Sequence, residues 1–136
     1  QVMEKFERSI YSLFKMGIAI QNFNKRSERK LGLSVVQWCL LRQLIDMPAS
    51  SAFSLATALG IHPSTLTQTL KRLEQKGFVY TSLDPKDSRK KLISITRSGK
   101  EKLDKTSHQI SSLPMKFSKI DIFMNELATG LATRLV

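Results

Sequence analysis

The polar residues between positions 63 and 76 have the spacing of one face of an α-helix. Pro63 suits the first turn of such a helix, because its ring fixes φ and its missing N–H group is not needed there. At roughly 100° per residue, Leu66, Leu70 and Leu73 fall on one side of the helix. The opposite side presents hydroxyl, amide and cationic groups, which are those of Ser64, Gln68, Lys71 and Gln75, flanked by Thr65 and Arg72.

These polar groups match the chemistry of nucleic acids. Amides pair with adenine, and long cations bind phosphate or guanine. A helix that buries its leucines in its own domain would therefore present a stripe suited to base edges and phosphates. A polar stripe is also typical of any solvated surface helix, so the interpretation depends on the elements on either side.

The residues before Pro63 predict a shorter helix followed by a tight turn. Ser50 or Ser51 is expected to cap this helix, and Gly60 is expected to end it. Its inward-facing residues are Leu55, Ala56 and Leu59. Residues 61–62 then form the turn, so the two helices have the spacing of a helix-turn-helix.

The residues after the second helix predict a small β-hairpin. Gly77 suits the left-handed position that follows a helix C-terminus. Residues 78–81 and 92–95 are rich in β-branched and aromatic side chains and are short enough for strands. The segment between them, residues 84–91, has four cations, two carboxylates and almost nothing apolar. Such a loop cannot pack into a core, so we expect it to project as a wing.

The two ends of the chain predict amphipathic helices. One runs from about residue 2 to 29, and its apolar residues are Met3, Phe6, Ile10, Leu13, Gly17, Ile20 and Phe23. Thr96 is expected to cap a helix that ends near Ser111, and a last stripe comprises Phe117, Ile120, Phe123, Met124, Leu127, Leu131 and Leu135. A small winged unit cannot cover all these faces, and leftover apolar surface usually becomes an oligomer interface. The alternative is a self-contained helical monomer.

The charge of the chain favours a polyanionic partner. There are 22 Lys and Arg residues against 11 Asp and Glu, which gives a net charge of +11. Residues 63–105 hold 11 basic and 5 acidic side chains, a net of +6, whereas residues 106–136 hold 3 and 2, a net of +1. Clustered basic charge is typical of nucleic-acid-binding proteins. A second basic run at residues 25–30 suits the negative end of the first helix dipole and is interpreted as a solvated face.

The length and composition indicate a single domain without a membrane segment. A chain of 15.4 kDa is about one domain. No signal peptide and no run of about 18 apolar residues is recognisable in the sequence. The single cysteine, Cys39, excludes an internal disulfide and fits a reducing, cytoplasmic setting. We therefore expect a cytoplasmic protein.

Five segments together resemble the MarR family of bacterial transcriptional regulators. Residues 33–38 are similar to the family's L-x-x-x-Q-W/F pattern, and residues 55–60 to its L-A-x-x-L-G pattern. Residues 73–79 resemble L-E-x-x-G-L-V, residues 84–89 resemble D-P-x-D-x-R, and residues 95–99 resemble L-T-x-x-G. Each motif alone is weak, but all five occur in the family's order and spacing. The similarity extends over essentially the whole chain.

The resemblance implies a mainly α fold with a small β wing, a winged helix-turn-helix flanked by N- and C-terminal dimerisation helices. Residues 1–136 would form a single domain, with residues 33–102 as the DNA-binding lobe and residues 1–32 and 103–136 as dimerisation helices. The implied function is that of a sequence-specific regulator, expected to be a repressor, that binds a pseudo-palindromic operator in double-stranded DNA as a homodimer.

In such a complex the recognition helix, residues 63–76, would lie in the major groove and the wing, residues 84–91, in the minor groove. The family's wing arginine matches Arg89, which Asp87 would hold in place; the alternative is that the two form only an exposed turn pair. The residues expected to contact DNA are Ser64, Thr65, Thr67, Gln68, Lys71, Arg72, Lys86, Asp87, Arg89 and Lys90.

The resemblance also implies control by a small molecule. Many members bind aromatic effectors between the dimerisation helices and the DNA-binding lobe, and the matching pocket residues are Met16, Ile20, Trp38, Cys39 and Arg42. Apolar residues at such spacings are also typical of an ordinary core. Members that sense oxidants have a reactive cysteine in the first helix, which this chain lacks, so Cys39 is predicted to be structural.

Other function classes fit the sequence less well. The two histidines are His62, expected in the turn before Pro63, and His108, expected on a solvated or dimer-facing helix position. No phosphate-binding loop, metal-ligand spacing or nucleophile motif is recognisable, so neither an enzyme nor a cofactor or metal is expected. The alternative function is a winged-helix scaffold that binds proteins, which should show apolar anchors where this chain has Gln68, Lys71 and Arg89.

Overall fold

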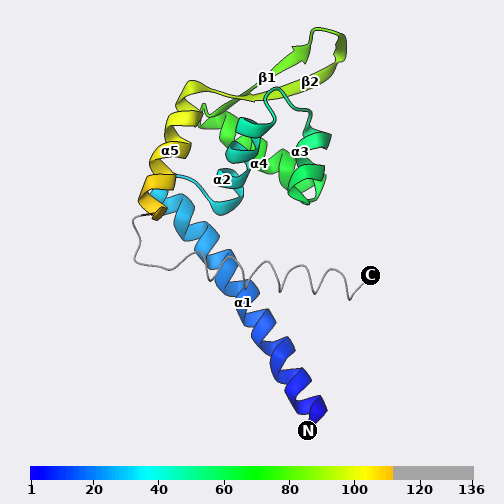
Figure 1. Cartoon of the computed structure of the whole chain (residues 1–136), viewed down its shortest axis with the longest axis vertical. Helices are drawn as coiled ribbons and strands as arrows, with labels where there is room; N and C mark the ends of the chain where they lie inside the picture. Colours follow the sequence, from blue (N-terminus) through cyan, green and yellow to red (C-terminus); the bar gives the residue numbers. More distant parts are fainter. Residues whose placement is uncertain (112–136) are drawn as a thin grey trace.

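The computed structural model describes residues 1–111, which form five helices and a two-stranded sheet (Figure 1). The elements are α1 (Val2–Leu31), α2 (Val35–Asp46), α3 (Ala52–Leu59), α4 (Pro63–Gln75), β1 (Val79–Asp84), β2 (Asp87–Ile95) and α5 (Arg97–Ser111). The predicted stripe between Phe117 and Leu135 lies outside the described residues. None of the helices between residues 1 and 111 combines the length and apolarity needed to cross a membrane.

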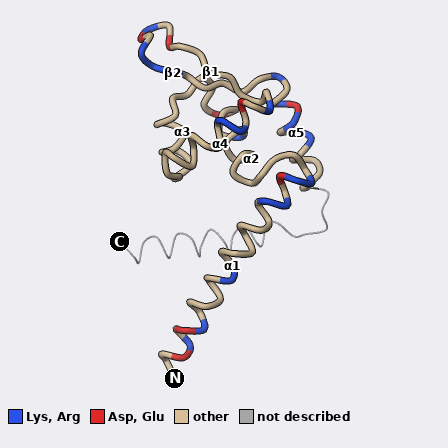
Figure 2. The backbone as a smooth tube through the Cα atoms, turned by 180° about the vertical axis from the view of Figure 1, so that it is seen from behind, with Lys and Arg blue, Asp and Glu red and all other residues tan. Residues whose placement is uncertain are grey.

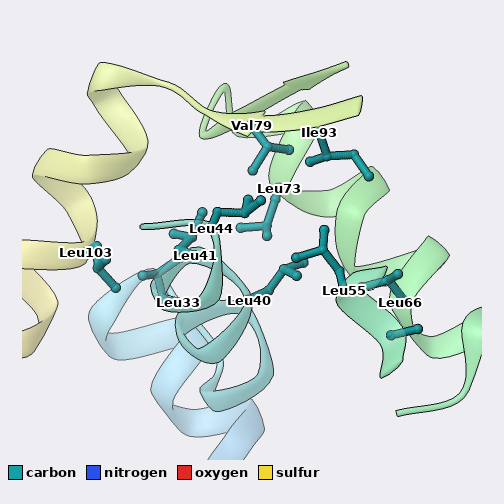
Figure 3. Close-up of a cluster of buried hydrophobic side chains, with 11 residues drawn as sticks. Leu33, Leu40, Leu41, Leu44, Leu55, Leu66, Leu73, Val79, Ile93 and Leu103 are labelled. Carbon is teal, nitrogen blue, oxygen red and sulfur yellow. The ribbon is translucent and has the colours of Figure 1, made fainter. Parts of the chain in front are cut away.

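The core is a cluster of leucines contributed by α2, α3 and α4. Figure 3 shows these side chains converging beneath the two strands and beside α5. The buried apolar residues are Leu33, Leu40, Leu41, Leu44, Leu55, Ala56, Leu66, Leu73, Val79, Ile93 and Leu103. Burying a leucine stabilises a fold by about 1.5–3 kcal/mol, so this cluster is the main apolar contribution to the stability of the lobe.

Serine side chains cap the first turns of α2 and α3. Ser34 begins α2 with a capping box. The Ser34 hydroxyl accepts a hydrogen bond from the backbone N–H of Gln37, and the side-chain oxygen of Gln37 accepts one from the backbone N–H of Ser34. Ser51, rather than Ser50, caps α3 by accepting from the Ser54 amide. Ser50 instead exchanges two backbone hydrogen bonds with Ile93, which ties the start of the helix-turn-helix to the wing.

The turn between α3 and α4 forms where it was expected. Gly60 adopts φ +67°, a left-handed conformation that few other residues tolerate. His62 caps α4, because its Nδ1 accepts from the Ser64 amide at 3.1 Å, and Pro63 occupies the first turn. Leu66 and Leu73 are buried and Leu70 is partly buried, so the predicted apolar face of α4 is confirmed.

The strands of the wing are longer than the sequence predicts. β1 pairs with β2 in antiparallel register from Val79 opposite Ile95 to Asp84 opposite Asp87. The predicted eight-residue loop at residues 84–91 is therefore wrong: only Pro85 and Lys86 lie between the strands. Pairing through the backbone needs no apolar side chains, so it continues into the charged segment. The hairpin still projects from the lobe (Figure 1).

Helix α1 has 30 residues. Its C-terminal end lies against the lobe, and the rest of the helix extends away from it (Figure 1). Ser27 is its only buried residue within the described structure. The exposed large apolar residues of α1 are Val2, Met3, Phe6, Ile10, Tyr11, Phe14, Met16, Ile18, Ile20 and Phe23. Within the described residues, most of the predicted stripe of the first helix is therefore open to solvent, and Leu13 is partly buried.

Helix α5 packs on α2 and is continuous across residue 103, the predicted start of the C-terminal dimerisation segment. Thr96 begins α5 as predicted, since its hydroxyl accepts from the Gly99 amide at 3.0 Å. Leu103 is buried in the core, and the Trp38 indole donates to the Ser107 hydroxyl at 3.0 Å. Leu103 and Ser107 of α5 therefore contact the lobe.

Candidate nucleic-acid interface

The outward face of α4 has the polar residues that its periodicity predicts. Ser64, Thr65, Thr67, Gln68 and Lys71 are all exposed. The hydroxyl of Thr67 donates to the Pro63 carbonyl at 2.9 Å, and that of Ser64 lies 2.7 Å from the His62 ring. Within residues 1–111 the side chains of Gln68 and Lys71 make no hydrogen bond or ion pair, so both are available to an external partner.

Arg72 was predicted to be free to contact DNA, but in the structure its side chain is paired within the chain. Its guanidinium forms an ion pair with Glu28, a residue of the last turns of α1. The prediction placed Arg72 beside Gln68 on the open face from helical periodicity alone. Periodicity gives no information about a partner that lies 44 positions away in the sequence. In this structure the Arg72 charge is therefore engaged within the chain.

A polar junction around Lys76 was not predicted from the sequence. Its ammonium donates to the Gln37 amide oxygen at 2.8 Å, to the Gly32 carbonyl at 3.1 Å and to the Glu28 carboxylate at 3.1 Å. Gln37 also donates to Glu28. The one available signal was that Glu28 is the single acid in the basic run at residues 25–30.

Glu28 stays ionised in this junction. Burial alone would raise the pKa of its carboxyl, but hydrogen bonds from Lys76 and Gln37 and the charges of Lys76 and Arg72 outweigh burial and lower the pKa. The basic run at residues 25–30 is thus only partly a solvated face, because its acid connects α1 to α2 and α4.

The end of the wing carries several exposed cations. Lys86, Arg89 and Lys90 are exposed, and Figure 2 shows basic residues gathered at the end of the hairpin. The Asp87 carboxylate accepts from the Arg89 backbone amide at 3.1 Å and from its Nε at 3.2 Å. The Arg89 side chain is 90% exposed, so the pair adds little stability but orients the guanidinium outward.

The residues of the predicted effector pocket have different environments. Met16 and Ile20 are exposed on α1, whereas Trp38 packs against the core and bonds Ser107. Arg42 forms an ion pair with Asp46 at 3.2 Å, one turn along α2. Burial raises the pKa of the partly buried Cys39 thiol. The described residues contain no group of His, Cys, Asp and Glu that could hold a metal.

Comparison with protein families gives one match in the central part of the chain. The model of the MarR family matches residues 33–91. An HTH-type transcriptional regulator of Bacillus subtilis, YxaD, is 35% identical over 79 residues, which cover 57% of this chain and 55% of that protein. The transcriptional activatory protein BadR of Rhodopseudomonas palustris is 28% identical over 101 residues, 72% of this chain and 58% of BadR. The chain spans little more than half the length of these two relatives.

Comparison with solved structures gives matches over most of the chain. The structure of reduced AbfR bound to DNA superposes with a TM-score of 0.77 at 23% identity and covers 98% of both chains. At this identity the likeness establishes the fold, a winged helix with flanking helices. The predicted fold class is therefore confirmed.

The Cys39 thiol is expected to react slowly in the folded protein. Burial raises its pKa, and the nearby Arg42 charge is paired with Asp46, so less thiolate is present at neutral pH than for a free cysteine. Alkylation by iodoacetamide at pH 7.5, a value near neutrality chosen to lie about one unit below the usual cysteine pKa, should be several-fold slower than in the urea-unfolded chain. An equal or faster rate in the folded protein would show that Cys39 is activated.

Proposed function

We propose that this chain, which belongs to the MarR family through its domain at residues 33–91, is a sequence-specific DNA-binding transcriptional regulator that acts as a homodimer. The family consists of DNA-binding regulators rather than enzymes. The observation that supports the proposal most strongly is the division of α4, which buries Leu66 and Leu73 and leaves Gln68 and Lys71 exposed and unpaired within the described chain.

The proposal assigns α4 to the major groove of DNA. The groove is wide enough for one helix, and base edges there differ in their donors and acceptors. The free amide of Gln68 suits adenine, which offers one donor and one acceptor, and the Lys71 ammonium suits phosphate or guanine. Thr65 lies one turn before Gln68 and extends the same exposed face.

The proposal assigns the wing to the minor groove. A narrow minor groove concentrates negative potential, which attracts an inserted arginine. The Asp87 carboxylate accepts hydrogen bonds from the Arg89 backbone amide and from its Nε, and the exposed Lys86 and Lys90 of the same hairpin would bind the flanking phosphates.

The exposed apolar residues of α1 support a homodimer. A contiguous apolar surface on a water-exposed helix usually marks an interface, and a second copy presents an identical surface. Two α1 helices packed together would place two α4 helices on one DNA duplex. A two-fold protein reads a two-fold site whose halves lie about one helical turn apart, so the operator would be pseudo-palindromic.

A small aromatic effector remains part of the proposal. Its pocket would involve Met16 and Ile20 of α1 together with Trp38, Cys39 and Arg42 of α2. The support comes from residue types alone: the set combines apolar and aromatic groups with one cation, Arg42, and such a combination suits an aromatic acid, although Arg42 is paired with Asp46 in this structure. A ligand bound beside Trp38 would act by disturbing the hydrogen bond from the Trp38 indole to Ser107, which connects α2 to α5.

Binding is expected to be dimeric and strongly salt-dependent. If each protomer neutralises about 3–4 phosphates, log K should fall against log salt with a slope of roughly −5 to −7. The probe is a duplex of about 30 bp, long enough for two half-sites, selected by the protein from a random library. Anisotropy titrations and sedimentation give slope and mass. A monomer at micromolar concentration, or affinity unchanged between about 50 and 200 mM salt, would contradict the proposal.

Base reading is expected to reside in Gln68 and sequence-independent affinity in Lys71. Gln68→Ala should cost about 1–3 kcal/mol on the selected duplex and relax preference at a few base pairs. Lys71→Ala should weaken all duplexes alike and flatten the salt slope by about 1 for each phosphate that is no longer neutralised. Competition against single-base variants of the selected duplex measures both. A uniform loss in Gln68→Ala would remove its reading role.

The contribution of Arg89 is expected to depend on the flanking sequence. Arg89→Ala should lose more affinity on duplexes with A·T-rich flanks than on duplexes with G·C-rich flanks, because the narrower groove provides the attraction. Asp87→Ala should show the same dependence more weakly, since Asp87 only orients Arg89. Lys90→Ala serves as the control variant and should lose the same affinity on duplexes with A·T-rich and with G·C-rich flanks. Equal losses in Arg89→Ala would argue against minor-groove insertion.

A further inference from the structure

The carboxylate of Glu28 connects three helices of the chain at one point. Its Oε1 pairs with Arg72, and its Oε2 accepts from Lys76 at 3.1 Å and from Gln37. Glu28 belongs to α1, Gln37 to α2, and Arg72 to α4, while Lys76 is the residue that ends α4. The contact therefore joins the helix proposed for dimerisation to the helix proposed for reading DNA.

The two cations of this junction are held unequally. Lys76 is 28% exposed and has three acceptors, of which the Gly32 carbonyl and the Gln37 amide oxygen do not depend on Glu28. Arg72 is 58% exposed, and within the described residues its guanidinium is hydrogen-bonded to Glu28 alone. Loss of the Glu28 charge would thus leave Lys76 in place and release Arg72.

Arg72 lies next to the proposed reading residue. Gln68 precedes it by one helical turn, and both line a cleft of about 260 Å³ together with Glu28 and Thr65. A released guanidinium at this position would reach the same DNA surface as Gln68. It would add a phosphate contact that does not depend on base sequence.

We propose that Glu28 is a positioning residue for DNA reading: it fixes the end of α4 against α1 and withholds Arg72 from the phosphate backbone. This inference rests on the proposed function. Its physical consequence is a balance between specificity and affinity. The ion pair keeps α4 at a fixed place relative to α1 and hence to the second α4, and it prevents one cation per protomer from binding any sequence alike.

The test compares Glu28→Gln with Glu101→Gln. Both variants remove one negative charge, but Glu101 lies on α5 and, within residues 1–111, forms its only ion pair with Arg97, whose side chain is 93% exposed. Affinity is measured for the selected duplex and a scrambled duplex across salt concentrations. Glu28→Gln should bind scrambled DNA more tightly, steepen the salt slope by about 0.9 per protomer, and reduce the preference for the selected duplex by about three- to tenfold, roughly 0.7–1.4 kcal/mol. Glu101→Gln should keep the wild-type preference.

A second variant tests the same point from the other partner. Arg72→Gln changes an exposed side chain, so it is expected to fold even if Glu28→Gln does not. Because Arg72 is withheld in the wild type, Arg72→Gln should leave the salt slope unchanged, and it should cancel the steeper slope when combined with Glu28→Gln. A flatter slope in Arg72→Gln alone would show that Arg72 binds phosphate and would overturn the inference.

The outcomes separate this inference from the proposed function. If the wild type prefers the selected duplex but Glu28→Gln behaves like Glu101→Gln, the positioning role is wrong and the proposed function stands. If the wild type binds selected and scrambled duplexes equally, the proposed function fails and the inference fails with it.

Discussion

The packing of α4 on α2 and α3 is the interaction on which the rest of the structure depends. Leu66 and Leu73 are buried only because the leucines of α2 and α3 form a continuous surface beneath them. Once that face is committed to the core, the opposite face must point outward, and within the described residues the side chains of Gln68 and Lys71 remain unpaired there. The site is therefore a consequence of burial: the same periodicity that stabilises the lobe determines which side chains are presented to a partner.

Two further constraints position that face. Backbone hydrogen bonds between Ser50 and Ile93 connect the base of the wing to the start of α3, so the wing and the helix-turn-helix are parts of one lobe. The Glu28 junction joins the lobe to α1, whose apolar surface is otherwise exposed in this chain. A cluster of this kind is partly buried and multiply hydrogen-bonded, so it constrains geometry more than an exposed ion pair does. Any shift of α1 relative to the lobe must move or break these contacts.

The sequence predicted the features that depend on local rules. Ser51, Gly60, Pro63 and Gly77 mark helix ends because capping and left-handed φ depend on a few consecutive residues. The wing was underestimated, since the side chains of residues 80–83 and 88–91 are exposed and show no alternation to mark strands. The engagement of Arg72 and Lys76 could not be predicted, because their partners lie 44 and 48 positions away and are chosen by packing. Local rules thus predicted the exposed polar face of α4, which is the proposed reading face, and tertiary contacts determine which of its cations are free.

The central claim is that two copies of α4 read one duplex from adjacent major grooves. Hydroxyl-radical and dimethyl-sulfate footprinting of the wild-type protein on its selected duplex tests this most directly. The account predicts two protected major-groove segments with centres about 10 bp apart, each flanked by a protected minor groove, related by two-fold symmetry. A single protected segment, or uniform weak protection along the duplex, would contradict it.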